Sequence, residues 1–466
     1  MLKPTIFREY DIRGVADVEL LSPDVEMLGQ AFGTYLLRHG GLRVNLGRDT
    51  RLSSLRLRDA LVRGLIASGC EVTDIGVAPT PVLYYSVFRL QADGGVMITG
   101  SHNPPEFNGF KVVCGSSTIH GESILEIRRM IETGDLARGP GAEKTADVVT
   151  PYVEEVSSQF RFPRRIRVAL DAGNGTGGPV MGPILARLNV DATEMFFDMD
   201  GRFPNHHPDP TVPKNLEPLI AKVRETGADL GIAFDGDTDR IGAVDDRGTV
   251  IYGDQLMIIY AREILTRKPG ATFIGEVKCS QLMYDDLAAR GGNPIMWKTG
   301  HSLIKAKMKE THAELAGEMS GHMFFADRYY GFDDAIYAAC RLMEIVANSG
   351  QPLSAQLADL PKTVTTPEIR FDCPDEVKFA VVQQATAELR ARHKVVDVDG
   401  ARVLFPKGWG LVRASNTQPV LVMRFEAATA GLLTEYRAEV EAVVERAVAA
   451  MRGAQGVAGS PAGLRD

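Results

Sequence analysis

The sequence predicts an α/β protein in which three similar mixed α/β domains and a C-terminal α+β domain surround a central cleft. The chain has 466 residues, which is too long for one ordinary core. From residue 42 onward, apolar strand-like runs alternate with helix-like segments, and the order strand, loop, helix, strand recurs about every 100 residues. We expect domain boundaries at residues 1–147, 148–250, 251–361 and 362–466.

The first repeat begins after the motif FREYDIRG. Its expected elements are a strand at 42–47, a helix at 54–69, a strand at 71–76 and a strand at 95–98 that leads into a loop. Strands separated by helices are typical of mixed or parallel α/β layers.

The second and third repeats follow the same order. In the second, a strand at 166–171 leads through a glycine-rich loop to a helix, and a strand at 229–234 ends in an acidic loop at 235–240. In the third, a strand at 272–277 precedes a helix at 282–291, and the loop GEMSGH lies further on. Folds of this kind collect ligands at strand ends, so each repeat is expected to contribute one loop to a shared site.

The C-terminal segment has a different pattern. Pro361 and the following TVTTPEI indicate a linker. We expect a helix at 377–393, strands at 395–400, 401–406 and 420–427, and a closing helix at 432–451, with GWG as a turn and RASNTQP as a loop. The residues of the tail from Gly453 are small and polar and show no helical or strand periodicity, so we expect the tail to be disordered.

The amino-acid composition excludes some classes of function. A hydrophobic content of 44% with 24% charged residues is typical of a globular protein, and a net charge of -8 argues against a general nucleic-acid binder. A small phosphorylated metabolite is a better candidate for the ligand than a nucleic acid. The chain shows no apolar signal segment and no membrane-length apolar run, so we expect a cytoplasmic protein with no membrane partner. Its five widely spaced cysteines indicate neither a disulfide framework nor a zinc pattern.

Ser101 is the predicted reactive residue. It follows an apolar strand and precedes His102 and a stiff Asn-Pro-Pro, so its hydroxyl should be presented rather than packed. Lys111 returns on the next strand as a nearby cation. A wide hairpin turn is the alternative, because turns use the same residue types.

The loop DGDTDR is the predicted metal site. Asp235, Asp237 and Asp239 are spaced to point to one side of an extended segment, and three adjacent carboxylates favour Mg²⁺. Arg240 would then reach a phosphate oxygen. A solvated acidic turn remains the alternative, whereas an EF-hand fails because Arg240 stands where glycine is required.

The loop at 173–178 matches the dinucleotide fingerprint GxGxxG. Asp171 stands just before these glycines, where its charge would face an incoming pyrophosphate. We therefore favour a structural strand-to-helix turn over a nicotinamide site.

Two further loops offer polar groups for a substrate. GEMSGH combines Glu318, Ser320 and His322, which suit sugar hydroxyls and phosphate, and Lys278 and His301 on neighbouring loops would add positive charge. The loop RASNTQP offers a guanidinium, hydroxyls and an amide for a phosphate. Polar turns are the alternative at both places.

Together these motifs resemble the α-D-phosphohexomutase superfamily, and most closely its bacterial phosphomannomutase/phosphoglucomutase branch. The resemblance runs from about Phe7 to Phe425 and rests on TGSHNPPEFNGFK, DGDTDR, GEMSGH and RASNTQP in the family's order, with FREYDIRG and EVKCS as further matches. Phe107 departs from the pattern, because tyrosine is frequent there in this branch.

The resemblance implies a reaction and a role for each residue. It implies that hexose 1-phosphate and hexose 6-phosphate interconvert through a phosphoserine at Ser101 and a hexose 1,6-bisphosphate, with one Mg²⁺ held by Ser101 and the three aspartates. The remaining implied catalytic residues are Arg13, His102, Lys111, Arg240 and His322. The implied substrate-binding residues are Tyr10, Lys278, His301, Glu318, Met319, Ser320, Gly321, His322, Arg413, Ser415, Asn416 and Thr417.

Two rival functions stay open at this point. One is a metal-dependent phosphatase with Asp235 as nucleophile, and the other is a regulator that only binds sugar phosphate or a cation. The expected partners are small sugar phosphates, and we expect a monomer.

Overall fold

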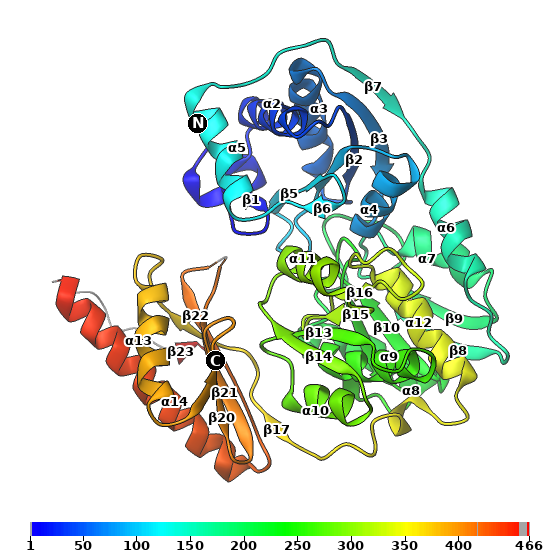
Figure 1. Ribbon diagram of the computed structural model, residues 1–466. Helices are drawn as coiled ribbons and strands as arrows, with labels where there is room; N and C mark the ends of the chain where they lie inside the picture. The colour runs from blue at the N-terminus through cyan, green and yellow to red at the C-terminus, as the bar shows by residue number, and fades with distance from the viewer. Residues whose placement is uncertain (1, 417, 456–463, 466) are drawn as a thin grey trace. The chain divides into compact units, whose positions relative to one another are not determined.

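The computed structural model describes residues 2–416, 418–455 and 464–465 (Figure 1). The chain forms two compact units, one made of residues 1–273 and 300–358 and the other of residues 274–299 and 359–466. Within the described residues, no helix is both long enough and apolar enough to cross a membrane. All five cysteines are free thiols, as expected.

The first sheet of the larger unit is mixed. Its strand order is β1-β5-β4-β2-β3-β7, with β6 beside β5. Strands β2, β3, β4 and β7 run parallel, whereas β5 is antiparallel to both β4 and β1. The strands are β1 (Ile12–Val15), β2 (Arg43–Arg48), β3 (Glu71–Val77), β4 (Gly94–Ile98), β5 (Phe107–Cys114), β6 (Ser117–Thr118) and β7 (Ala142–Thr145).

Helices cover the centre of this sheet, where the strands are apolar on both faces. All five residues of β4 are buried, which is typical of a central parallel strand. Phe32, Leu46, Leu61 and Phe110 belong to one core cluster that joins sheet and helices. The helices are η1 (Pro4–Ile6), α1 (Ala16–Glu19), α2 (Ser22–Arg38), α3 (Ser54–Ser68), α4 (Thr80–Arg89) and α5 (Glu122–Thr133).

The second sheet brings two loops of the predicted site together. Its strand order is β12-β11-β10-β8-β9, and β8, β9 and β10 are parallel. Since parallel strands end at the same edge, the glycine-rich loop after β8 and the acidic loop after β10 are neighbours. The elements are α6 (Val149–Ser158), β8 (Ile166–Asp171), α7 (Gly178–Leu185), β9 (Val190–Met195), η2 (Pro213–Leu216), α8 (Glu217–Thr226), β10 (Leu230–Phe234), β11 (Ile241–Asp245) and β12 (Val250–Ile251).

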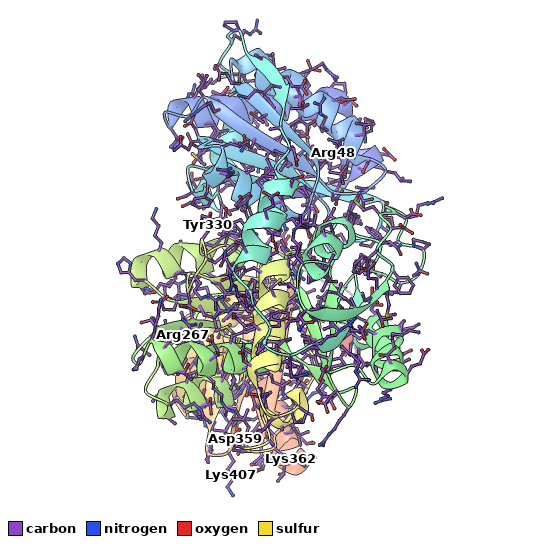
Figure 2. The ribbon with its side chains drawn as sticks, turned by 90° about the vertical axis from the view of Figure 1, so that its right-hand side faces the viewer. Arg48, Arg267, Tyr330, Asp359, Lys362 and Lys407 are labelled. Carbon is purple, nitrogen blue, oxygen red and sulfur yellow. The ribbon has the colours of Figure 1, made fainter. Side chains whose placement is uncertain are left out.

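The rest of the larger unit centres on an antiparallel hairpin. Strands β15 (Leu315–Gly317) and β16 (Met323–Phe325) pair so that the loop GEMSGH forms the turn between them. Arg267, labelled in Figure 2, ties the end of α9 to the loop after β16 through Asp327, with Nη2 at 2.7 Å from Oδ2. The remaining helices are α9 (Gly253–Arg267), α11 (His301–Thr311), α12 (Ala335–Asn348) and η3 (Leu353–Ala355).

The smaller unit is built on an antiparallel sheet with strand order β19-β20-β21-β22-β18-β23, and β17 pairs with β22. Helices α13 and α14 lie side by side in Figure 1 and share one core with the sheet. The elements are β13 (Thr272–Glu276), which crosses the boundary between the units, α10 (Gln281–Ala289), β14 (Asn293–Trp297), β17 (Val364–Thr365), β18 (Ile369–Asp372), α13 (Lys378–Arg390), β19 (Lys394–Val396), β20 (Ala401–Phe405), β21 (Gly408–Ala414), β22 (Val420–Ala427), α14 (Ala430–Gln455) and β23 (Leu464–Arg465).

The predicted GWG turn is wrong. These residues lie inside β21, which runs on to Ala414 between β20 and β22. Trp409 is fully buried, its Nε1 donates to Glu426 Oε2 at 2.7 Å, and the Arg402 guanidinium lies 3.9 Å from its ring centroid. Glycine on each side of tryptophan led us to predict a turn. The buried contacts of the indole stabilise the strand conformation instead.

The predicted disorder of the tail is wrong in part. Helix α14 continues to Gln455, and β23 pairs antiparallel with β18. Residues 456–463 and 466 lie outside the described residues.

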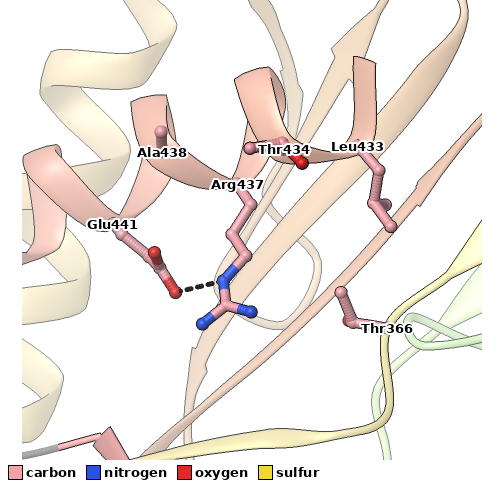
Figure 3. A pocket seen from close by; sticks show the side chains of 6 residues that line it. All are labelled: Thr366, Leu433, Thr434, Arg437, Ala438 and Glu441. Carbon is pink, nitrogen blue, oxygen red and sulfur yellow. Dashed lines mark hydrogen bonds and ion pairs between the residues drawn. The ribbon is translucent and has the colours of Figure 1, made fainter. Parts of the chain in front are cut away.

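A shallow depression of about 280 Å³ lies beside α14 (Figure 3). Arg437 and Glu441 line it and pair with each other at 2.7 Å. No residue of the predicted site belongs to its lining.

Candidate active site

Ser101 lies in a loop that is built around a buried arginine. Its backbone adopts φ +50°, in the left-handed region, and its N–H donates to Thr99 Oγ1 at 2.8 Å. The Arg51 guanidinium donates to the Ser101 carbonyl at 2.7 Å, and a Cβ on Gly100 would lie 2.5 Å from Arg51 Cζ. Arg51 also pairs with nearby Asp49, its Nε at 3.1 Å from Oδ2. Sequence reasoning missed Arg51, because the partners that tie it to the serine loop are backbone carbonyls that lie far along the chain.

The hydroxyl of Ser101 is buried, contrary to the expectation that it would be exposed. Ser101 is only 2% exposed, and its Oγ donates to Asp235 Oδ2 at 2.9 Å. The acidic loop covers the serine, since a Cβ on Gly236 would lie 2.7 Å from the Ser101 carbonyl oxygen. The first and second sheets therefore bring together the two groups that the sequence singled out.

The three aspartates converge, but not through an extended segment. The loop turns at Thr238, whose φ is +64°, and the side chains of Asp235, Asp237 and Asp239 each offer an oxygen within 4.8 Å of the others. All three residues are fully buried. The backbone N–H groups of Asp239 and Arg240 donate to Asp235 Oδ1 at 3.0 and 3.1 Å.

Lys111 neutralises part of this charge. Its Nζ lies 2.8 Å from Asp237 Oδ2 and also contacts Asp239 Oδ2. Burial opposes the charge on Lys111, but Asp237 and Asp239 outweigh it and raise the lysine pKa. Burial and the two neighbouring carboxylates raise the pKa of Asp235, whereas Lys111 overcomes burial at Asp237 and lowers its pKa.

Two oxygens of the acidic loop have no hydrogen-bond partner within the described part of the chain. They are Asp237 Oδ1 and Asp239 Oδ1, and both are buried. Buried carboxylate oxygens are rarely left unpaired, and hard divalent cations such as Mg²⁺ take oxygen ligands of this kind. The donor set fits such a cation, with Ser101 Oγ next to Asp235.

The glycine-rich loop is a structural support for the acidic loop, as we favoured. A Cβ on Gly175 would lie 2.6 Å from the Gly236 carbonyl oxygen, and one on Gly177 would lie 2.8 Å from the Phe234 ring. Asp171 accepts from Gly173 N at 2.8 Å and pairs with His206 Nε2 at 2.9 Å. These glycines allow two strand-end loops to pack backbone against backbone.

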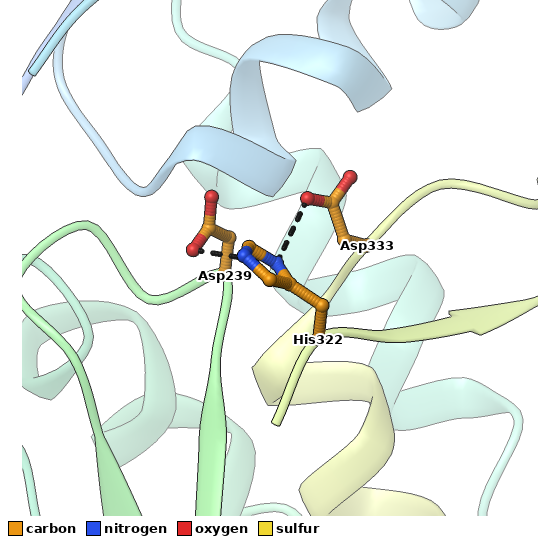
Figure 4. Close-up of side chains that lie close together, drawn as sticks. All are labelled: Asp239, His322 and Asp333. Atoms are coloured by element: carbon orange, nitrogen blue, oxygen red, sulfur yellow. Dashed lines mark ion pairs between the residues drawn. The ribbon is translucent and has the colours of Figure 1, made fainter. Parts of the chain in front are cut away.

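His322 connects the hairpin loop to the acidic loop (Figure 4). Its Nδ1 lies 3.2 Å from Asp333 Oδ2 and 3.7 Å from Asp239 Oδ1. Arg240 Nε donates to His322 Nε2 at 2.9 Å. Since Nε2 accepts, the ring proton lies on Nδ1 and faces the carboxylates, which disfavours a metal at Nδ1 although these three residues are close enough to hold one.

Asp333 and Lys305 are site residues that sequence reasoning missed. Lys305 Nζ lies 3.0 Å from Asp333 Oδ1 and, despite burial, lowers the pKa of this carboxyl. The adjacent Asp334 caps α12 by accepting from Tyr337 N at 2.9 Å. Asp334 is thus explained as the cap of α12. Asp333, directly before it, has no such structural role, and this difference is the sequence signal that could have identified it as a site residue.

Arg13 and His102 flank the serine loop. Arg13 Nη1 donates to Asn103 Oδ1 at 2.9 Å, and its Nη2 pairs with Asp11 at 2.5 Å. His102 Nδ1 lies 2.8 Å from Asp209 Oδ2. Burial and the nearby Arg240 charge lower the His102 pKa to about 4.

The predicted sugar-binding residues of the hairpin lie near His322. Glu318 is buried and accepts from Gly300 N at 2.7 Å, and Ser320 Oγ lies 3.5 Å from its other oxygen. Gly321 adopts φ +95° and packs on the Ile241 carbonyl, so only glycine fits there, with Met319 half-buried beside it.

The predicted positive charge on His301 is wrong. The Tyr10 ring makes an edge contact with the His301 ring and the His322 ring stacks on it, at 6.2 and 5.8 Å between centroids. Burial lowers the His301 pKa well below its usual range, so its imidazole is neutral.

The smaller unit carries the remaining predicted residues. Lys278 pairs with Glu368 at 3.3 Å, and this cation lowers the Glu368 pKa to about 2. Arg413 Nε donates to Asp399 Oδ2 at 2.9 Å. The Ser415 hydroxyl oxygen accepts from Gln418 N at 3.2 Å, Asn416 is half-buried, and Thr417 lies outside the described residues.

Comparison with known proteins identifies the family. Four phosphoglucomutase/phosphomannomutase models match in order: alpha/beta/alpha domain I at residues 4–138, domain II at 150–248, domain III at 252–364 and the C-terminal domain at 368–443. The chain belongs to the phosphoglucomutase/phosphomannomutase family.

Similar proteins agree with this assignment. Phosphomannomutase/phosphoglucomutase of Pseudomonas aeruginosa is 45% identical over 95% of this chain and 96% of its own. Phosphoglucomutase of Neisseria gonorrhoeae is 42% identical over 94% and 96%. The crystal structure of a phosphoglucomutase/phosphomannomutase family protein from Burkholderia thailandensis has a TM-score of 0.90 at 42% identity and covers 96% of this chain and 98% of that one.

Membership of the phosphoglucomutase/phosphomannomutase family confirms the predicted multidomain α/β fold. The domain boundaries drawn from the sequence stay a prediction, as do the roles of individual site residues.

Proposed function

We propose that this chain interconverts hexose 1-phosphates and hexose 6-phosphates of glucose and mannose, with Ser101 as the phosphoryl carrier and a hexose 1,6-bisphosphate as the intermediate. One observation supports this above all others: Ser101 Oγ lies 2.9 Å from Asp235 Oδ2 in a buried cluster of three carboxylates, two of which have an oxygen without a hydrogen-bond partner within the described residues. That arrangement suits a phosphoserine beside a divalent cation.

The proposed transfer exchanges one P–O bond for another. A sugar hydroxyl attacks the phosphorus of phosphorylated Ser101, the bond from phosphorus to Ser101 Oγ breaks, and the sugar becomes a bisphosphate. The bisphosphate then turns over, and its other phosphoryl group returns to Ser101 Oγ. Mg²⁺ held by Asp235, Asp237 and Asp239 would stabilise negative charge on the transferring oxygens.

Charged side chains would assist the same step. The Lys111 ammonium touches two of the carboxylates, and Arg240 is anchored through its backbone to Asp235 and through Nε to His322. Both cations can offset charge on the phosphoryl group. Of the four candidates for proton transfer, which are Lys111, His102, His322 and Arg13, Lys111 lies nearest to these carboxylates.

Substrate choice follows from the hairpin. Glu318 and Ser320 carry acceptors and a hydroxyl for sugar hydroxyls that occupy similar places in both orientations of the sugar. Arg413, Ser415, Asn416 and Thr417 would hold the phosphate that does not react. Such a grip ignores carbon 2, so glucose and mannose phosphates should both be substrates. Glucosamine phosphate should be poor for a different reason: by resemblance, the related phosphoglucosamine mutases typically carry glutamine where Met319 stands. Monomeric state and cytoplasmic location remain predictions from the sequence.

One assay separates this proposal from its rivals. Purified protein with Mg²⁺, glucose 1-phosphate and a trace of glucose 1,6-bisphosphate should yield glucose 6-phosphate. Release of inorganic phosphate instead would indicate the phosphatase, and no conversion would indicate a binding protein. Ser101→Ala should remove the activity, whereas the matched control Ser116→Ala, on an exposed turn, should retain it.

A further inference from the structure

A cavity of about 430 Å³ lies in the larger unit, outside the site described above. Its walls come from α4, the turn between β5 and β6, the C-terminal half of α11 and the loop after β16. Neither Ser101 nor the three aspartates nor His322 line it. Its volume is in the range of sites that hold small organic molecules.

Flat aromatic rings form one wall of this cavity. Tyr330, labelled in Figure 2, and Phe332 stack with centroids 5.8 Å apart and an angle of 4° between the rings. Phe88 lies 5.0 Å from Tyr330 and 6.0 Å from Phe332, tilted by 34° and 31°. Phe88 and Tyr330 are each 39% exposed, so the wall is open to an incoming ring. A planar apolar group fits against such a surface.

The polar groups of the lining favour an anion. Lys305 and Lys309 contribute two ammonium groups, and the turn between β5 and β6 contributes the hydroxyls of Ser116 and Ser117. Glu314 is the one carboxylate in the lining, and Lys268 already pairs with it at 2.8 Å. The cavity therefore offers cations and hydroxyl donors beside an apolar wall.

Lys305 belongs to the cavity and to the catalytic cluster at the same time. Its Nζ lies 4.2 Å from the centroid of the Tyr84 ring, which also lines the cavity, and 3.0 Å from Asp333 Oδ1. The other oxygen of Asp333 faces His322, which accepts from Arg240. An anion that attracts the Lys305 ammonium competes with Asp333 for it.

We propose that this cavity binds a small planar aromatic carboxylate, which draws Lys305 away from Asp333 and thereby slows the reaction at the catalytic cluster. The regulatory half of this inference rests on the proposed mutase function, whereas the binding half does not. Loss of the Lys305 contact leaves Asp333 and His322 less firmly held, so the effect should appear in kcat rather than in KM.

The test uses the full-length protein and two probes that differ in charge. In calorimetric titrations, 2-naphthoate should bind saturably, and its neutral isostere 2-naphthamide should bind at least tenfold more weakly. Ser116→Trp, which fills the cavity from its exposed rim, should abolish binding. Ser116→Ala removes one of the hydroxyl donors but leaves the space, the aromatic wall and both lysines in place, so saturable binding should remain. Lys305→Gln should remove the difference between the two probes, and Lys305→Arg should keep it.

Turnover then tests the coupling. Saturating 2-naphthoate should lower the kcat of the wild-type protein severalfold without changing KM for glucose 1-phosphate. The Ser116→Trp variant should have the kcat of the wild type, and 2-naphthoate should not lower it. Equal binding of the two probes, or binding that survives Ser116→Trp, would overturn the assigned site. Binding that leaves turnover unchanged would overturn the coupling, and binding by a protein with no mutase activity would refute the proposed function alone.

Discussion

The buried carboxyl of Asp334 should contribute a loss of stability that grows as pH rises, and Asp334→Asn should remove that contribution. Asp334 is 1% exposed and accepts hydrogen bonds from Tyr152 Oη at 2.8 Å, Tyr329 Oη at 2.7 Å and Tyr337 N at 2.9 Å. Within the described residues, no lysine or arginine pairs with it. Burial outweighs these hydrogen bonds and raises its pKa to about 6.

The sign and size follow from that pKa. Between the ordinary value of 3.8 and about 6, the Asp334 carboxyl holds more of its proton in the folded protein than in the unfolded chain. The contribution of Asp334 to the free energy of unfolding therefore decreases as pH rises through this window and is constant above it. At 1.36 kcal/mol for each pH unit, the loss amounts to about 3 kcal/mol.

Asparagine keeps the cap and removes the charge. Its side-chain oxygen can still accept from Tyr337 N, and the tyrosine hydroxyls can rotate to accept from its amide. Urea unfolding should therefore be measured by circular dichroism from pH 4 to pH 8 for the wild type and Asp334→Asn. The variant should have the higher midpoint above pH 6, and the two midpoints should converge toward pH 4.

The control is an aspartate at another helix start. Asp147 accepts from Thr150 N at 3.1 Å and is exposed, and the hydrogen bonds from Thr150 lower its pKa. Asp147→Asn should shift the pH profile little and in the opposite sense. A profile for Asp334→Asn that runs parallel to the wild type, or a variant that is less stable at pH 8, would refute the reasoning.

Three further predictions concern the site. Intact-mass measurement should find one phosphate on the active protein, mapped to Ser101. The Ser101→Ala variant should carry no phosphate and should have no turnover. Turnover that persists in this variant would rule out the carrier role. Gly175→Ala should destabilise the acidic loop and lower kcat at least tenfold, because its methyl group would meet the Gly236 carbonyl oxygen at 2.6 Å, and a normal kcat would show that the loops can separate. The kcat/KM values for glucose and mannose 1-phosphates should correspond to activation free energies that differ by about 1 kcal/mol or less. A hundredfold preference for either sugar would therefore contradict the proposed grip on the sugar.

The sequence was informative where a local pattern determines a local structure. Strands that end in polar loops recur through the chain, and each repeat was expected to contribute one strand-end loop to a shared site. This is why Ser101 and Asp235, which follow strands of different sheets, could be predicted to act together although 134 residues separate them. The glycines at 175 and 177 could likewise be interpreted as structural from the charge of Asp171.

The rest depended on contacts that no local pattern encodes. Arg51 holds the serine loop through backbone carbonyls, and Asp333 gains its role only when the loop before α12 meets His322. Trp409 is in a strand because Arg402 and Glu426 enclose its ring, although glycine flanks it on both sides. Burial also reversed two expectations, since it covers the Ser101 hydroxyl and keeps His301 neutral.

The charge balance of the acidic loop leads to a last prediction about the cation. When all three carboxylates are ionised, they and the Lys111 ammonium leave two negative charges in a fully buried cluster, which one divalent cation would neutralise. Asp237→Asn removes one of these charges and one ligand, so it should weaken Mg²⁺ binding at least tenfold. Lys111→Met removes the competing cation, so it should strengthen Mg²⁺ binding by a similar factor, although turnover should fall.

Calorimetric titration of the wild type and these variants with MgCl₂ measures the effect directly. Lys144→Met, on the exposed strand β7, is the matched control and should leave Mg²⁺ affinity unchanged. Circular dichroism at each titration point shows whether the buried carboxylates left by Lys111→Met are compatible with folding, and saturating Mg²⁺ should restore any lost stability. If Lys111→Met binds Mg²⁺ more weakly than the wild type, then Lys111 positions the aspartates for the cation instead of competing with it. The charge argument for the site would then be wrong.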